Sequence, residues 1–324
     1  MDPGQVIRPL PEGTEPVRAR AGRPASWRLA VAAVLLWLLF RQVPWGQFWL
    51  AWRDLSLPAV LASSGLTILS MVVSAWKWRL VLEEPGLATP GTARLFRLYL
   101  VGLFFNNFLP SGMGGDVVRV AQVSREVGVA RAAASVVAER LLAAVGLVVP
   151  SLVFFLPYRQ QLGALSAVVP LLAVAVAALV GLCFFPGWAR GLLRFSRRWP
   201  RVAEALSGFL EILGRYRERP RRLAVVILWS IVFQGLVVLI NFVLLRGLGV
   251  PVSLGACMTV IPLTSALAMV PLSINGLGLR EWSYVALLAP FGVDAATAVA
   301  ASLSFFVVVT LVSLIGGACY LLER

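Results

Sequence analysis

Long apolar segments separated by short polar ones fill most of this chain. Several of them hold 15 to 28 residues, and about 20 residues of α-helix cross the hydrocarbon core of a bilayer. The pattern therefore predicts an all-α, polytopic helical membrane protein. The predicted apolar helices cover residues 29–40, 57–76, 95–109, 132–156, 162–185, 223–245, 254–270, 282–291 and 295–322.

Two polar segments differ from this pattern. Residues 1–27 are rich in Pro, Gly and Arg, a composition that predicts a disordered, basic cytoplasmic tail. Residues 186–222 contain ten arginines and three acids, with apolar residues at helical spacing. We predict that this second segment is cytoplasmic, either as an amphipathic helix on the membrane surface or as a plain loop. Residues 28–324 as a whole are expected to form a single transmembrane domain.

The distribution of positive charge predicts the topology, because cytoplasmic loops carry an excess of Lys and Arg. The chain satisfies this rule, with both termini cytoplasmic, only if residues 95–127 and 254–291 enter the membrane and return. A proline and a glycine break each segment, at Pro110 and Pro271. Irregular backbone at membrane depth is tolerated where it is buried in protein or lines a wet cavity. We therefore expect two re-entrant helical hairpins.

The two hairpins also predict an internal repeat. A span, a hairpin and a second span occupy about residues 57–156, and the same order returns with opposite orientation in about residues 223–322. Inverted repeats whose broken helices meet near the middle of the membrane are typical of secondary transporters. The sequence therefore favours an inverted repeat of the transporter type.

Composition and charge narrow the classes of function. Hydrophobic residues make up 59% of the chain and charged residues 14%, which is too little charge for a soluble domain. There is no histidine, and the three cysteines lie within apolar segments, so we expect neither a metal nor another cofactor. Cytoplasmic loops and contact with anionic lipid explain the net charge of +14. Because no basic, aromatic-rich soluble module is present, no nucleic-acid partner is expected.

Charged residues also occur within or at the tips of apolar segments, where each costs at least about 2.5–3.5 kcal/mol at the bilayer centre. Two interpretations are open: a buried ion-pair network that joins the hairpins, or a polar site whose arginines bind an anionic group. Glycines before Asp116 add backbone amides at a helix N-terminus, which suit an anion. The predicted substrate-binding residues are Asn106, Asn107, Ser111, Gly114, Gly115, Asp116, Arg119, Glu139, Arg140, Ser273, Asn275, Gly276, Arg280 and Glu281.

Three motifs carry a resemblance to a known family. Residues 106–119 (NNFLPSGMGGDVVR), 134–141 (ASVVAERL) and 271–281 (PLSINGLGLRE) resemble, in this order, the flippase-like transmembrane region of lysylphosphatidylglycerol synthases. The resemblance implies a multi-pass protein of a bacterial-type plasma (inner) membrane that moves a lipid between leaflets, with the charged residues in its polar cavity. The chain ends at Arg324, so we expect a stand-alone member without the aminoacyl-transferase domain and without lysyl transfer.

The leading hypothesis is a flippase-like protein, not an enzyme, that binds or translocates an anionic (phospho)lipid. One alternative is an accessory membrane subunit of a lipid-modifying or glycosyltransferase system, with a lipid-modifying enzyme as its partner. A less favoured alternative is a membrane-embedded lipid head-group transferase. Such an enzyme would need Asp116, Glu139 and Glu281 to converge on a metal ion.

Overall fold

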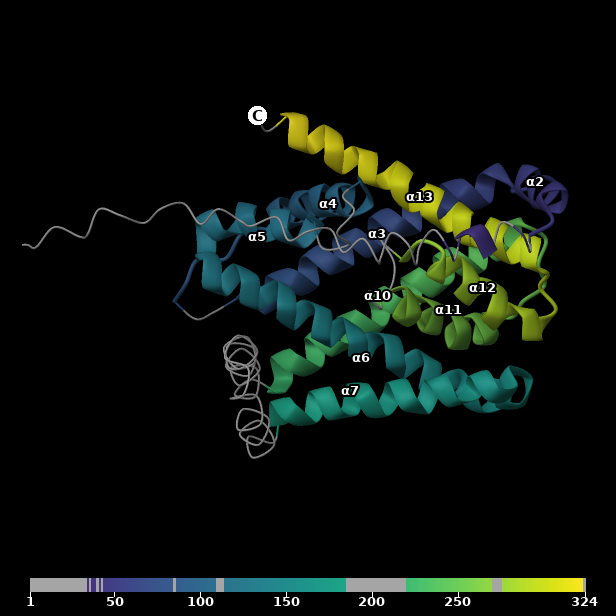
Figure 1. Cartoon of the computed structure of the whole chain (residues 1–324). Coiled ribbons are helices and arrows are strands. Elements are labelled where there is room, and N and C mark those ends of the chain that lie inside the picture. Colours follow the sequence, from purple (N-terminus) through teal and green to yellow (C-terminus); the bar gives the residue numbers. More distant parts are fainter. Residues whose placement is uncertain are drawn as a thin grey trace, which may run out of the picture.

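The computed structural model describes residues 34, 36–38, 41, 43–83, 86–108, 114–184, 220–269 and 276–322. Every regular element in these ranges is a helix (Figure 1), which confirms the predicted all-α class. The predicted N-terminal tail, residues 186–219 of the basic segment and the tips of both hairpins lie outside the described residues.

Four stretches are long and apolar enough to cross a membrane by length and composition. They are α3 (Leu57–Leu82), the stretch Val129–Ala178 that begins with α6 (Val129–Leu162), α10 (Pro220–Gly247) and α13 (Ala295–Leu322). The short helix η1 (Gly163–Ala167) divides the second stretch and leads into α7 (Val168–Phe184), which runs back beside α6 (Figure 1). Gly163 permits this reversal because its φ of 53° is readily adopted by glycine. The protein is therefore a multi-pass membrane protein.

Shorter helices connect the long ones in two pairs. The first pair lies between α3 and α6 in the chain, and the second lies between α10 and α13. The first pair is α4 (Thr92–Phe108) and α5 (Gly114–Val127), and the second is α11 (Leu254–Met269) and α12 (Leu279–Leu288), followed by the short helix η3 (Ala289–Phe291).

Contacts at the helix ends place these two pairs at opposite ends of the bundle. Arg131 Nε, near the start of α6, donates to the Leu82 carbonyl at the end of α3 over 3.1 Å. The chain of α4 and α5 therefore leaves and returns at this end. At the other end, the amide of Ser56 before α3 donates to the carbonyl of Gly247 in α10 over 3.4 Å. Figure 1 shows α11 and α12 at that second end, beside the start of α13.

The helices of the two halves pack in matching pairs, with α3 against α10, α4 against α13 and α11 against α6. Small residues permit this closeness, as is common between membrane helices. A side chain at Gly316 of α13 would overlap the Leu100 carbonyl of α4, and a Cβ at Gly146 of α6 would lie 2.5 Å from the Ser230 oxygen of α10. The inverted repeat and the depth of the hairpins stay predictions.

The observed helix α3 is longer than the predicted span. The prediction ended this span at Trp76, whereas α3 continues to Leu82 and is buried at its Lys77 and Trp78 positions. Lys77 therefore lies within a long apolar helix rather than after its end. The physical reason is that Lys77 has a buried carboxylate partner, Glu139, which removes the usual objection to a lysine within an apolar helix.

A further helix, α2 (Trp45–Arg53), was not predicted. Its aromatic residues follow helical spacing, and Phe48 packs against the start of α13 at Ala296 and Val299. Trp52 Nε1 donates to Ser304 Oγ of α13 over 3.0 Å. This short helix therefore covers the end of the bundle at which the second helix pair lies. Within the predicted first span, the described residues 34 and 36–38 are helical.

Candidate functional site

A pocket of about 240 Å³ lies where the first helix pair meets the long helices. Five helices contribute its walls, namely α3, α4, α5, α6 and α10. Five charged side chains lie there among apolar and uncharged polar neighbours, so the charges are clustered within largely apolar walls. The lining residues are Met71, Ser74, Lys77, Tyr99, Gly102, Leu103, Asn106, Asp116, Arg119, Glu139, Arg140, Ala143 and Phe233.

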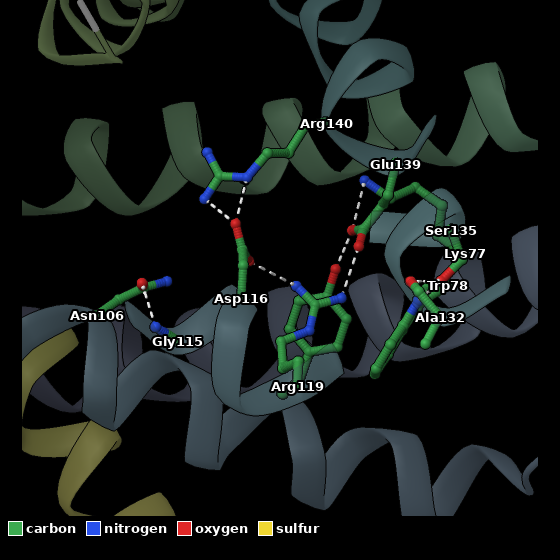
Figure 2. Close-up of polar contacts among 11 residues, drawn as sticks. Lys77, Trp78, Asn106, Gly115, Asp116, Arg119, Ala132, Ser135, Glu139 and Arg140 are labelled. Carbon is green, nitrogen blue, oxygen red and sulfur yellow. Dashed lines mark hydrogen bonds and ion pairs between the residues drawn. The ribbon is translucent and has the colours of Figure 1, made fainter. Parts of the chain in front are cut away.

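Glu139 of α6 is the centre of the hydrogen-bond network (Figure 2). Its carboxylate accepts from Arg119 Nη2 over 2.7 Å and lies 3.3 Å from Lys77 Nζ. The hydroxyl of Tyr99 donates to the same carboxylate. Glu139 thus joins α3, α4 and α5 to α6 through charge-assisted contacts, which are stronger than neutral hydrogen bonds.

Arg119 of α5 is held between two aromatic rings. Its guanidinium carbon lies 4.1 Å from the ring centroid of Trp78 and 3.7 Å from that of Tyr99. Stacking suits the planar guanidinium and fixes its orientation. Trp78 is itself fixed, because its Nε1 donates to Ser135 Oγ over 2.9 Å. Arg119 Nη1 also donates to Asp116 Oδ1 over 3.4 Å, so this arginine links both carboxylates of the site.

Arg140 is the most accessible cation of the site. Its Nε donates to Asp116 Oδ2 over 2.5 Å, and its Nη2 forms an ion pair with the same oxygen. The side chain of Arg140 is 41% exposed, whereas those of Arg119 and Lys77 are 7% and 2% exposed. Of the three cations, Arg140 is therefore the one that is most open to the surroundings of the protein.

Two glycines bring α4 and α5 close enough to form the site. A side chain at Gly115 would overlap the Gly102 carbonyl, and a Cβ at Gly102 would lie 2.7 Å from Arg119 Cδ. The amide of Gly115, in the first turn of α5, donates to Asn106 Oδ1 over 2.8 Å. A side-chain acceptor thus satisfies an amide at the start of α5 that the helix itself leaves unpaired.

The pocket carries an imbalance of charge. Three cations, Lys77, Arg119 and Arg140, face two carboxylates, Asp116 and Glu139, which gives a formal charge of +1. The six charged residues among the predicted site residues, three acids and three arginines, would have been neutral together, and Lys77 is the cation that they lack. Across the described helices, no group of three or more His, Cys, Asp or Glu residues could hold a metal ion.

The charged residues of α12 form a second, separate cluster. Arg280 Nη2 donates to Glu281 Oε1 over 2.8 Å, and Ser302 Oγ of α13 donates to the same oxygen over 3.2 Å. The amide of Gly278 donates to Glu281 Oε2 over 2.7 Å, which caps the start of α12. The guanidinium of Arg280 lies 5.1 Å from the ring centroid of Phe306. These partners satisfy the Glu281 carboxylate within the second half of the chain.

The structure therefore divides the predicted site. Asn106, Gly115, Asp116, Arg119, Glu139 and Arg140 come together, with Gly114 starting α5 beside them. Within the described ranges, no ion pair or hydrogen bond joins them to Arg280 or Glu281, so these charges form two separate clusters. The charged residues of α5 pair with one another and with α6. Those of α12 pair with each other, and Ser302 of α13 adds a hydrogen bond.

The remaining predicted residues lie elsewhere. Asn107 does not line the pocket, and its buried Nδ2 makes no hydrogen bond with the described residues. Gly276 lies just before α12 with a φ of 72°. Ser111, Ser273 and Asn275 lie outside the described residues.

Lys77, Trp78 and Tyr99 are site residues that the sequence did not reveal. A signal for Lys77 was present in α3, where buried polar residues recur at alternating spacings of four and three. This spacing places them on one face of a helix. Extension of the span beyond Trp76 would have added Lys77 to that face. The residues of this stripe are Ser63, Thr67, Ser70, Ser74 and Lys77.

The fold and the site together define a class, a multi-pass helical membrane protein with a charged, partly open pocket beside a pair of short helices. The family model for the lysylphosphatidylglycerol synthase TM region matches residues 26–317, and the chain therefore belongs to this family. It is also similar to the UPF0104 membrane protein PH1989 of Pyrococcus horikoshii. The two are 24% identical over 262 residues, which cover 72% of this chain and 78% of the relative.

Proposed function

We propose that the charged pocket binds the phosphate of an anionic phospholipid and that the protein moves this lipid between leaflets. The observation that carries the proposal is the half-exposed Arg140 at a pocket with a formal charge of +1. The fork of an arginine matches phosphate oxygens in a bidentate way. The proposal makes the protein a transporter rather than an enzyme.

The size and position of the pocket support this proposal. Its volume of about 240 Å³ is several times the share of one water molecule in the liquid, about 30 Å³. The pocket lies in a bundle whose outer faces are apolar, as a site reached from the lipid phase requires. The two short helix pairs at opposite ends of the bundle suit an inverted repeat, in which access alternates around a central site.

The charges at the bundle ends support a cytoplasmic orientation for the end that carries the first helix pair. Arg79, Arg94, Arg125 and Arg131 lie at that end, and cytoplasmic loops are enriched in such residues. We include in the proposal that both chain termini face the cytoplasm and that the protein resides in a plasma membrane of bacterial type.

A reconstitution experiment tests the function. Purified protein is placed in vesicles with fluorescent phosphatidylglycerol, and a membrane-impermeant reductant bleaches the outer leaflet. The wild type should expose the inner pool, and Arg140→Gln should slow this exposure about tenfold because a charge-assisted contact is lost. Arg79→Gln is the matched control, because Arg79 is an exposed arginine outside the pocket whose Nη1 donates to Thr92.

The outcomes separate the proposed functions. Translocation at the rate of protein-free vesicles would contradict a flippase. If phosphatidylglycerol still bound to such a protein in an Arg140-dependent way, the accessory-subunit alternative would be favoured. Turnover of the head group to a new product would favour the transferase.

A further inference from the structure

Lys77 is an unusual residue both in the sequence and in the fold. It is the sole lysine of the chain, and it lies within the long apolar helix α3 with its side chain 2% exposed. Its Nζ lies 3.3 Å from Glu139 Oε1 and 5.3 Å from the ring centroid of Phe233. A buried cation in such a place is costly and needs compensation, so its presence calls for a role.

The role follows from the charges around it. Without Lys77, the pocket would hold Arg119 and Arg140 against Asp116 and Glu139, and would be neutral. Lys77 lies beside Glu139 and compensates part of the negative charge of this carboxylate, which Arg119 also contacts. The two arginines are consequently under-compensated by the remaining negative charge.

We infer that Lys77 is the specificity-determining residue that sets the pocket to accept one negative charge, namely the phosphodiester of a monoanionic phospholipid. This inference rests on the proposed function. A monoanion brings the pocket to neutrality, and uncompensated charge is costly in a site of low dielectric. A zwitterionic head group contributes no net charge, and its ammonium is repelled by the arginines. A dianion leaves the pocket with an excess of negative charge.

A charge-restoring double substitution tests the inference. Lys77→Met makes the pocket neutral and keeps a side chain of similar length, while Glu139 retains its contacts with Arg119 and Tyr99. The double variant Lys77→Met, Glu139→Gln returns the formal charge to +1. Its new amide can still accept a hydrogen bond from Arg119.

The measured quantity is the ratio of phosphatidylglycerol to phosphatidylethanolamine that purified protein retains from an equimolar mixed micelle. Lys77→Met should lower this ratio by about ten- to a hundredfold, as expected for one unit charge about 6–12 Å away at an effective dielectric constant of about 20. The double variant should recover most of the ratio. Arg79→Gln removes one positive charge from the same helix outside the pocket and should leave the ratio unchanged.

The possible results lead to distinct conclusions. A ratio that survives Lys77→Met, or that stays low in the double variant, would overturn the inference. If Lys77→Met fails to fold, Lys77→Gln takes its place, because it is also neutral and can donate a hydrogen bond to Glu139, and the same loss of the ratio is expected. A wild type with no preference for phosphatidylglycerol would instead contradict the proposed function. A parallel measurement with sodium phosphate alone distinguishes the sources of the phosphate, because binding of free phosphate with the same affinity as phosphatidylglycerol would overturn a lipid as the ligand.

Discussion

The two short helix pairs hold arginines at matching places, yet their surroundings differ. Arg119 and Arg280 each lie nine residues after the proline that breaks their segment. Arg119 joins a network of three cations and two carboxylates beside a pocket. Arg280 instead forms a closed pair with Glu281, to which Ser302 and a backbone amide add hydrogen bonds. The cluster around Arg119 thus has a net positive formal charge, whereas the cluster around Arg280, at the equivalent position, is neutral.

Under the proposed function, the two halves have different roles. An unbalanced, partly open cluster can exchange a resident carboxylate for a ligand. A balanced and buried pair stabilises the start of a helix, because it satisfies both the charge and the capping amide. Matched substitutions in the two halves test this contrast in three predictions, and a fourth concerns a single residue at the start of α13.

The largest effect is expected for Glu281→Gln, compared with Asp116→Asn. Loss of Glu281 leaves Arg280 buried without its anion, which should lower the free energy of unfolding by about 3–5 kcal/mol. Loss of Asp116 mainly affects the half-exposed Arg140, so the cost should be about 1 kcal/mol. Denaturant titration of the purified proteins measures both values. Equal losses would show that the two clusters have the same structural role.

The second comparison concerns the glycines five residues after each proline, Gly115 and Gly276. A methyl group at Gly115 would overlap the backbone of Gly102, and Gly115→Ala should cost about 3 kcal/mol through overpacking. Gly276→Ala should cost about 1–2 kcal/mol, the strain of a left-handed conformation, because Gly276 has a φ of 72° and its Cβ would lie 3.1 Å from the Ala268 oxygen. The same titration applies, and a greater loss at Gly276 would contradict this order.

The apolar pattern was sufficient to predict most of the helices. The predicted span 295–322 coincides with α13, and 254–270 differs from α11 by one residue at its end. Such agreement arises because each long helix must present apolar side chains to lipid over its whole length. Charged positions within these helices could also be recognised as unusual from the sequence alone, since their cost in a membrane is general.

The partners of those charges could not be predicted. Lys77 meets Glu139 across 62 positions of sequence, and the rotation of two helices about their axes determines whether they touch. The position and rotation of α12 likewise determine that Arg280 and Glu281 lie apart from the other four predicted charged residues. The packing of α2 through Phe48 also depends on a contact with a distant helix, α13, which the sequence does not specify.

The third prediction compares Arg119→Lys with Arg280→Lys. Lysine keeps the charge but loses the planar fork and the contact with Trp78 and Tyr99, so Arg119→Lys should reduce retained phosphatidylglycerol about fivefold. Arg280→Lys should leave lipid retention within error of the wild type. Lipid extraction from the purified variants gives the comparison. An equal decrease in both would favour a relay, in which the two arginines pass a head group from one half to the other.

The smallest effect concerns Asp294, which lies before α13 and outside the membrane-spanning helices. Burial alone would raise its pKa, but hydrogen bonds from the hydroxyl and amide of Thr297 outweigh burial and hold the pKa of this carboxyl below its ordinary value. Because the folded-state pKa lies below the unfolded-state pKa, the stabilisation is present above about pH 4 and is lost as the pH falls through the folded-state pKa. Asp294→Ala should cost about 1 kcal/mol near neutral pH, the usual value of an N-cap. Asp294→Asn keeps a capping oxygen and should therefore lose less stability than Asp294→Ala near neutral pH. Because an amide does not titrate, this variant should also lack the decrease in stability that Asp294 causes at acidic pH. Thermal unfolding of the three proteins between pH 7 and pH 3 measures this, and identical pH profiles would show that Asp294 contributes nothing through its charge.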